Sequence, residues 1–193
     1  MILVSPSSVD LRRSAELSAA HVCVLDAEDR LVWVNPAWER FARENGGESV
    51  LERWPPGNLY LSAVPEVLLP FLRDAFKRVR AEQAVFEHEY ECSSPTQLRR
   101  FQMDVRPLDQ GALLVTHTLR HEAPLGRDAE PALLALYEGE EGIVTQCCHC
   151  RRTRRSDTGK AVWAWVPQWV QQPLPGTSHG LCDICLEYYY PQA

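Results

Sequence analysis

Four cysteines form two short pairs toward the C-terminal end of the sequence. Cys147 and Cys150 make one Cys-x-x-Cys pair, and Cys182 and Cys185 make the other. Each pair can supply two thiolates from a single turn, and structural zinc takes four such ligands in a tetrahedron with Zn–S near ~2.3 Å. Because four thiolates leave no open coordination position, the pattern predicts one structural Zn²⁺ rather than a catalytic one.

Three further residues beside these pairs are alternative ligands. Cys148 and His149 lie inside the first pair, and His179 lies three residues before Cys182. Replacement of one cysteine by His179 is the main variant, although we expect His179 to hydrogen-bond a sulfur or a backbone carbonyl instead. An iron–sulfur cluster also takes four thiolates. Free or disulfide-bonded cysteines are the remaining alternative, and the paired spacing favours zinc over all of these.

Aromatic residues are dense around the cysteine pairs. Trp163, Trp165 and Trp169 lie between the pairs, and a run of tyrosines at 188–190 follows the second. We expect at least two of the tryptophans to form a small core around the metal. Trp165 and Trp169 are also candidates for a partner-binding surface, because exposed tryptophans often anchor protein interfaces.

A basic run follows the first cysteine pair, at Arg151, Arg152, Arg154 and Arg155. Arginines beside a zinc module can bind nucleic acid or form a partner surface. The net charge of −6 opposes non-specific nucleic-acid binding. We therefore expect a solvated face, or contacts with the acidic Glu138, Glu140 and Glu141.

The residues that precede this module predict an α+β domain. Apolar, β-prone runs at 22–25 and 31–34 are separated by a polar turn and predict a β-hairpin. Asn35-Pro36 ends the second run, and Pro36 suits the first turn of a helix over 37–45. A helical stripe over 64–81 contains Pro70, which predicts a kink or a late helix start.

Three more strands complete the expected order. Glu residues alternate with apolar residues over 85–92, a period of two that is typical of a half-buried strand. Runs at 98–108 and 112–119 are also β-prone. Two strands, helices and then three strands predict an antiparallel sheet with helices on one face.

This first block resembles the PAS family. The resemblance lies in Val24-Leu25-Asp26, in the stretch from Leu31 through Asn35-Pro36 to Trp38, and in the later runs at 89–95 and 101–108. It implies the PAS fold, a five-stranded antiparallel sheet with flanking helices. It also implies sensing or protein interaction, but no particular ligand, because PAS domains share a fold and not a cofactor.

The tail resembles a small module found beside PAS, receiver or kinase domains in bacterial signalling proteins. The matching residues are the first cysteine pair with its arginines, Ser178-His179-Gly180, the second cysteine pair and Tyr190-Pro191. The resemblance implies a zinc-ribbon-like module. We therefore expect a PAS domain at 1–121, a linker at 122–142 and a zinc module at 143–193.

A pocket in the PAS domain is the other candidate site. His88, Tyr90 and His117 fall at apolar positions of its strands and are candidate pocket residues. Hydrogen-bonded core histidines are the more common outcome of such a pattern. Neither the histidine expected for haem nor the cysteine motif expected for a flavin adduct is present, so the ligand of this domain is left open.

The 193 residues carry no motif of a hydrolase, a phosphate-binding loop or a metalloprotease. There is no long apolar run and no basic leader, which predicts a cytoplasmic protein without a membrane segment. We expect a non-enzymatic signalling protein that binds a protein partner or itself as a homodimer. The alternatives are a DNA-binding regulator and a redox or metal sensor.

Overall fold

The computed structural model describes most of the chain, namely residues 8–45, 47, 51–52, 55–139, 141–158 and 161–191. The chain divides into two compact units. The first comprises Met1–Ala63, Asp74–His88 and Gln102–Thr118, and the second comprises Val64–Arg73, Glu89–Phe101 and Leu119–Ala193.

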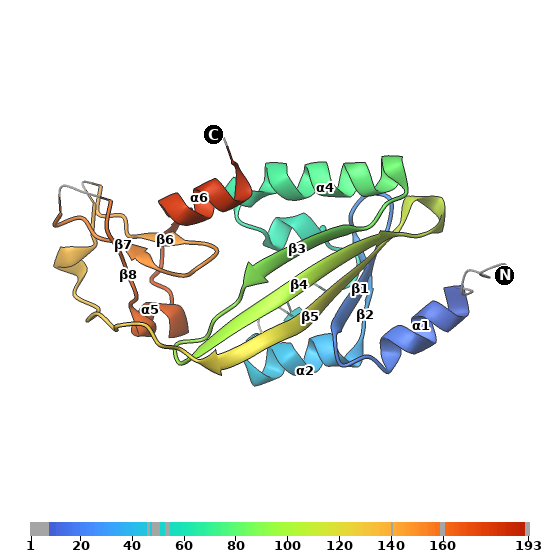
Figure 1. Ribbon diagram of the computed structural model, residues 1–193, viewed down its shortest axis with the longest axis horizontal. Coiled ribbons are helices and arrows are strands. Elements are labelled where there is room, and N and C mark those ends of the chain that lie inside the picture. The colour runs from blue at the N-terminus through green and yellow to red at the C-terminus, as the bar shows by residue number, and fades with distance from the viewer. Residues whose placement is uncertain are drawn as a thin grey trace. The chain divides into compact units, whose positions relative to one another are not determined.

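A five-stranded sheet follows the order β2-β1-β5-β4-β3 (Figure 1). This five-stranded sheet with its helices confirms the α+β class and the five-stranded antiparallel sheet expected from the sequence. β1 lies between β2 and β5, and Cys23 of β1 pairs with Val34 on one side and Val115 on the other. The strand bounds are β1 His21–Leu25, β2 Leu31–Val34, β3 Phe86–Glu91, β4 Gln97–Pro107 and β5 Leu113–Pro124.

Two helices, α2 (Pro36–Glu44) and α4 (Leu69–Glu82), begin where the proline signals in the sequence predict. Pro70 lies at the second position of α4, where its missing N–H would have no partner in the helix. A late helix start, rather than a kink, is therefore the outcome. The bounds are α1 Ser8–Glu16, α2 Pro36–Glu44, η1 Tyr60–Ala63, η2 Glu66–Leu68, α4 Leu69–Glu82 and η3 Asp109–Gly111.

Asn35 ties three elements of the first unit together and is fully buried. Its side-chain oxygen accepts hydrogen bonds from the N–H of Trp38 at 3.0 Å and of Val22 at 3.1 Å, so it caps α2 and contacts β1. Its amide nitrogen donates to the carbonyls of Ala15 and Ala20, each at 2.9 Å. One side chain thus joins the end of α1 to β1 and α2.

The core of the first unit lies between the sheet and its helices. Alternate residues of β4 and β5 are buried, as the period of a strand requires. One face of α4 is buried through Ala75, Phe76 and Val79. The buried residues contributed by the strands are Val22, Cys23, Leu25, Leu31, Met103, Val105, Leu113, Val115 and His117.

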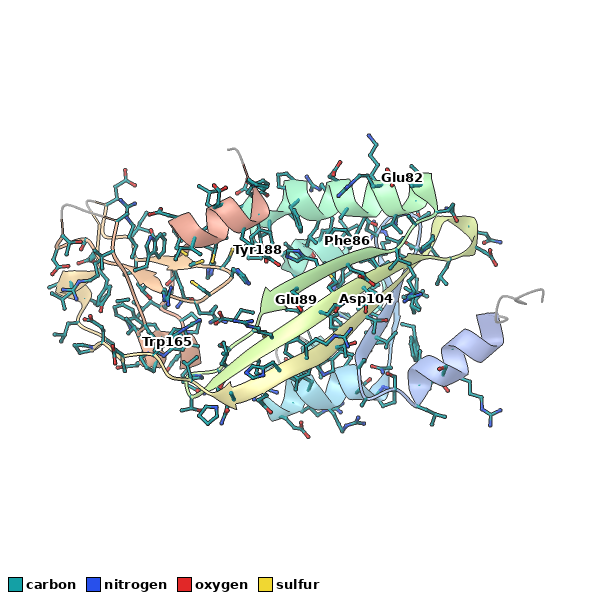
Figure 2. The ribbon with its side chains drawn as sticks, in the orientation of Figure 1. Glu82, Phe86, Glu89, Asp104, Trp165 and Tyr188 are labelled. Carbon is teal, nitrogen blue, oxygen red and sulfur yellow. The ribbon has the colours of Figure 1, made fainter. Side chains whose placement is uncertain are left out.

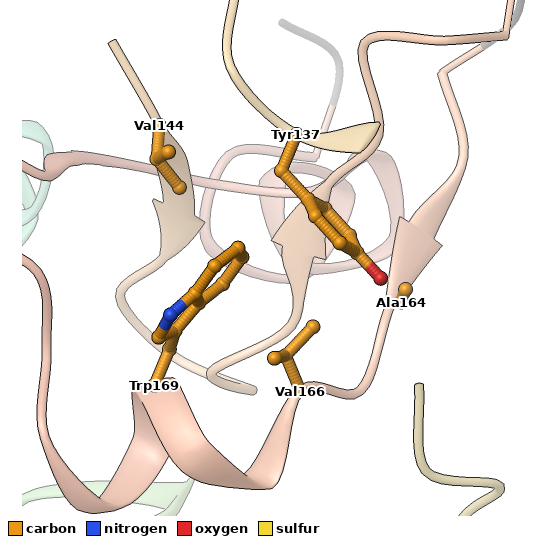
Figure 3. Packing of buried hydrophobic residues seen from close by; sticks show 5 residues of the cluster. All are labelled: Tyr137, Val144, Ala164, Val166 and Trp169. Atoms are coloured by element: carbon orange, nitrogen blue, oxygen red, sulfur yellow. The ribbon is translucent and has the colours of Figure 1, made fainter. Parts of the chain in front are cut away.

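The second unit contains a small four-stranded sheet in the order β8-β7-β6-β9. β6 pairs with β7 antiparallel and with β9 in parallel. Tyr137, Val144, Ala164, Val166 and Trp169 form its apolar core, and the Tyr137 and Trp169 rings meet edge to face at 4.9 Å (Figure 3). The bounds are β6 Thr145–Cys147, β7 Thr153–Arg154, β8 Trp163–Ala164, α5 Pro167–Gln171, β9 Ser178–Gly180 and α6 Asp183–Tyr189.

The segment expected to be a linker is partly regular. β5 continues to Pro124, and beyond it the N–H of Leu125 donates to the carbonyl of Thr96 at 2.8 Å. The same segment contains one 3-10 turn, η4 Leu134–Leu136, and the Tyr137 that follows it is buried in the core. The domain boundaries themselves stay a prediction. Within the described part of the chain, no helix is long and apolar enough to cross a bilayer.

Candidate metal centre

The sulfur atoms of the two cysteine pairs meet in the second unit. The Sγ atoms of Cys147, Cys150, Cys182 and Cys185 all lie within 4.8 Å of one another. Their exposed fractions are 0%, 5%, 3% and 5%, and Trp163 and Leu181 pack against them. The structure therefore brings together the four residues that the sequence spacing selects as ligands.

Local backbone geometry explains the position of the first pair. Cys147 ends β6, and its carbonyl accepts a hydrogen bond from the N–H of Arg151 at 3.0 Å, which closes the turn that carries Cys150. Arg151 takes a left-handed conformation at φ 62 to return the chain to β7. The Cys147 N–H then donates to the carbonyl of Arg152 at 2.8 Å.

The second pair reaches the first through β9 and α6. β9 lies parallel to β6 with Gly180 opposite Cys147, so the chain arrives beside the first pair. Cys182 is the N-cap residue of α6, and Cys185 lies in the first turn of that helix. Two cysteines three positions apart on one helical turn share a face, which directs both toward the first pair.

The spacing of the sulfur atoms fits a tetrahedral metal. In a tetrahedron with a metal–sulfur distance of ~2.3 Å, neighbouring sulfur atoms lie about 3.8 Å apart. The Sγ atoms of Cys150 and Cys182 are 3.7 Å apart. Four buried, soft donors within 4.8 Å of one another could hold a metal ion.

The four thiols titrate as one hydrogen-bonded group. Hydrogen bonds from the other thiols, that of Cys150 first, hold the pKa of Cys147 far below its usual range. At Cys182 the bond with Cys147 raises the pKa, but those with Cys150 and Cys185 bring it down to about 7. The same network raises the pKa of Cys150 and Cys185. A metal ion would displace the remaining protons, so its binding depends on pH.

The three alternative ligands lie outside the cluster of four sulfur atoms. His149 uses Nε2 to accept a hydrogen bond from the N–H of Glu91 at 2.8 Å. His179 is exposed on β9, opposite Gln146 of β6. Cys148 is half-buried, and burial and the neighbouring Cys147 raise the pKa of its thiol to about 12. The role expected for His179, a bond to a sulfur or a carbonyl, stays a prediction.

The arginine run does not form one solvated face. Arg151 donates to Gln146 Oε1 and to the carbonyl of Val170, each at 3.3 Å. Arg155 pairs with Glu130 at 2.7 Å and Asp157 at 2.6 Å, so its carboxylate partners differ from the expected Glu138 and Glu141. Glu140 lies outside the described residues. Arg154 is exposed, and Arg152 is half-buried.

Trp165 and Trp169 are only 3% and 4% exposed. They belong to the interior of the module, so the alternative of a partner surface at these two side chains is wrong for this fold. Trp169 packs in the apolar core against Tyr137, and Trp165 lies under the guanidinium of Arg127.

Arg127 is a contributor that the sequence analysis missed. Its guanidinium donates to Glu91 Oε2 at 2.7 Å and to the Cys150 carbonyl at 3.1 Å. It also lies over the Trp165 ring, 4.9 Å from the centroid. A single arginine between prolines and glycines belongs to no periodic pattern, so no signal in the sequence marks it.

A cavity of about 360 Å³ opens beside the cysteine cluster within the second unit. Cys150, Cys182 and Cys185 line it, whereas Cys147 does not. Arg100 and Arg152 also line it, together with apolar and aromatic residues that include Tyr90, Ile184 and Tyr188. Three of the four cysteines therefore border this cavity.

The candidate pocket residues of the PAS-type domain lie in separate surroundings. His117 is buried, and its Nε2 shares a hydrogen bond with the Tyr60 hydroxyl at 3.1 Å. Burial, with a smaller effect of His21, lowers the pKa of His117 to about 3. His88 stacks against Phe86, whereas Tyr90 stacks against Phe101 in the second unit. Tyr90 alone among the three lines the described cavity.

No family model matches the chain. A curated relative is an uncharacterized 104.1 kDa protein in the hypE 3′ region of Rhodobacter capsulatus, 35% identical over 109 residues, or 51% of this chain. The chain spans only 11% of the length of that protein.

Several solved structures are similar to part of this chain. An RNA-binding light-oxygen-voltage receptor is 16% identical with a TM-score of 0.41, over 62% of this chain and 37% of that one. A PAS domain of an HTR-like protein from Haloarcula marismortui is 14% identical with a TM-score of 0.35, over 58% and 96%. A PAS domain from a two-component sensor histidine kinase is 16% identical with a TM-score of 0.35, over 60% and 100%.

Proposed function

We propose that this chain is a non-enzymatic signalling protein, in which a PAS-type domain senses a signal or binds protein and a module with one structural Zn²⁺ docks a partner. The observation that carries the proposal is the cluster of four buried sulfur atoms within 4.8 Å of one another. Four thiolates fill the coordination sphere of zinc, so the metal would hold the module together rather than activate a substrate.

The surface of α6 supports the docking part of the proposal. Ile184 is 73% exposed and Tyr188 is 48% exposed, and the two residues lie one helical turn apart beside the metal ligands. Exposed apolar side chains on a rigid helix are typical of a protein-binding surface. The partner is a second protein or another copy of this chain, and we place the complex in the cytoplasm without a membrane contact.

The test is the metal content of the full chain, purified without added metal, together with its absorption spectrum. One zinc per chain and no visible absorption are expected. Iron with visible bands would show a cluster or a haem instead and would overturn the structural-zinc proposal. A purified, folded protein that holds no metal would overturn it as well.

A second candidate function, a redox sensor, is favoured by the cavity that Cys150, Cys182 and Cys185 line. A hydroperoxide that enters it would accept two electrons from two thiolates. The first thiolate attacks the O–O bond to give a sulfenic acid and releases hydroxide or an alkoxide; the second displaces hydroxide from the oxidised sulfur and forms a disulfide. Zinc release on this oxidation is the measurement, and full metal retention would exclude the sensor.

A DNA-binding role has less support, because Arg151 and Arg155 are engaged within the module. Salt-dependent binding to duplex DNA that is lost on charge reversal of Arg152 and Arg154 would restore it.

A further inference from the structure

Strand β3 has an outer edge with backbone groups that could pair with a further strand. β3 is the last strand of its sheet and pairs only with β4 among the described strands. Beside its end, the N–H of Cys92 donates to the carbonyl of Arg99 at 3.0 Å, toward β4. Because backbone groups alternate in direction along a strand, those of Glu89 and Glu91 face away from β4. Such groups are what an added strand would pair with.

Two side chains of the metal module occupy these backbone groups. The N–H of Glu91 donates to His149 Nε2 at 2.8 Å. The Tyr188 hydroxyl donates to the carbonyl of Glu89 at 2.8 Å, and Figure 2 marks both residues. We call His149 and Tyr188 the β3 cap. It satisfies one donor and one acceptor on the open edge of the strand.

Both members of the β3 cap are held by the metal ligands. His149 lies between Cys148 and Cys150 in the first pair, and Tyr188 lies in α6 one turn beyond Cys185. Their rings stack at 5.7 Å with an angle of 15°. The Tyr189 ring packs edge-on against His149 at 5.2 Å. If the two cysteine pairs separate, the surfaces that hold these rings together separate as well.

We propose that the metal centre covers the edge of β3 through the β3 cap, and that loss of the metal uncovers this edge for an extended, basic peptide. The inference rests on the proposed metal centre. An exposed edge binds extended peptides by main-chain hydrogen bonds. The metal state of the module would then decide whether that surface is available.

The negative charge of the β3 glutamates favours a positively charged peptide as the partner. Glu87, Glu89 and Glu91 share one face of the strand, and Glu87 and Glu89 are exposed. The carboxylate of Glu91 is paired with Arg127. Lys or Arg at alternate positions of an added strand would face the two exposed carboxylates, and opposite charges across strands are stabilising. Another copy of β3 would place glutamates close together, which is unfavourable.

The first experiment measures amide hydrogen exchange at Glu91 in the full chain, with the zinc content of each sample determined. Removing zinc with a chelator should speed exchange at Glu91 by at least about tenfold, because its hydrogen bond is lost. Since metal-free protein could unfold locally for other reasons, the decisive sample is zinc-loaded His149→Phe. This variant keeps an aromatic ring but lacks the acceptor, and it should show the same acceleration with its zinc retained.

His179→Ala is the matched control, because His179 is exposed on β9 and lies outside the β3 cap. Its Glu91 amide should exchange as in the wild type. Unchanged exchange in zinc-loaded His149→Phe would overturn the inference while leaving the structural metal intact. Absence of zinc from the purified wild-type protein would instead overturn the proposed function.

The second experiment tests the partner with a fluorescent, alternating Lys–Val peptide of about ten residues. The peptide should bind the zinc-loaded double variant His149→Phe/Tyr188→Phe at least about tenfold more tightly than the zinc-loaded wild type. An alternating Glu–Val peptide is the control and should bind neither protein. Equal affinity for the two proteins would overturn the partner assignment, and so would dimerisation of the double variant without peptide binding.

Discussion

Asn35→Ala tests whether one buried side chain organises the first unit. The change removes four short hydrogen bonds, of which two are accepted from Val22 and Trp38 and two are donated to Ala15 and Ala20, and also a long fifth bond of 3.5 Å to the Ser18 carbonyl. Loss of the helix cap costs about 1 kcal/mol. The other three short bonds contribute about 1 kcal/mol each when their buried partners are left without substitutes. The free energy of unfolding should therefore fall by about 4 kcal/mol.

The assay is urea denaturation followed by tryptophan fluorescence and far-UV circular dichroism. Asn45→Ala is the matched control, because Asn45 is an exposed residue at the other end of α2 whose amide donates to the Phe41 carbonyl at 2.9 Å. We expect that control to lose no more than about 0.5 kcal/mol. If Asn35→Ala were no less stable than Asn45→Ala, the reasoning that Asn35 joins α1, β1 and α2 would be refuted.

Three further predictions concern the metal, the pH dependence and the module core. Cys185→Ser should weaken zinc binding by orders of magnitude in a competition with a chromophoric chelator, whereas Cys148→Ser should bind like the wild type. Because His117 has a lowered pKa of about 3 when folded, against 6.5 when unfolded, stability should fall by about 1 kcal/mol per pH unit as the pH drops below 6.5. In denaturation experiments at pH 7 and pH 5, His117→Gln should lose this dependence of stability on pH. A variant with the full pH dependence of the wild type would contradict the assignment to His117. Trp169→Ala should destabilise the module by about 3–5 kcal/mol, read as a lower melting temperature, and an unchanged temperature would show that the buried ring contributes little.

Local signals in the sequence predicted several of the helices and strands. Asn35-Pro36 placed the start of α2, Pro70 the start of α4, and the alternating glutamates placed β3. Each signal works because the residue restricts its own backbone or the face that its side chain takes. The cysteine spacing predicted the four sulfur atoms that the fold brings together.

Contacts between segments that are distant in the chain could not be predicted from the sequence. Nothing near Arg127 indicates that it pairs with Glu91, and nothing near Tyr137 indicates that it completes the module core. The four arginines read as one charged run, yet the fold turns Arg151 and Arg155 toward partners far along the chain. Such contacts depend on the tertiary fold and not on local pattern. The hydrophobic periodicity of the sequence therefore does not predict them.

The parallel pairing of β6 and β9 has a kinetic consequence. Thr145 pairs with Ser178 and Cys147 with Gly180, so a long stretch of chain must be closed before these strands meet. Pairing between distant segments forms slowly, because the entropy of loop closure is lost before the contacts are gained. The first cysteine pair can capture an ion early, but the second pair reaches it only once β9 is in place. Binding of one ion by all four thiolates therefore requires this loop to be closed, and the entropy of closing it opposes assembly of the complete site.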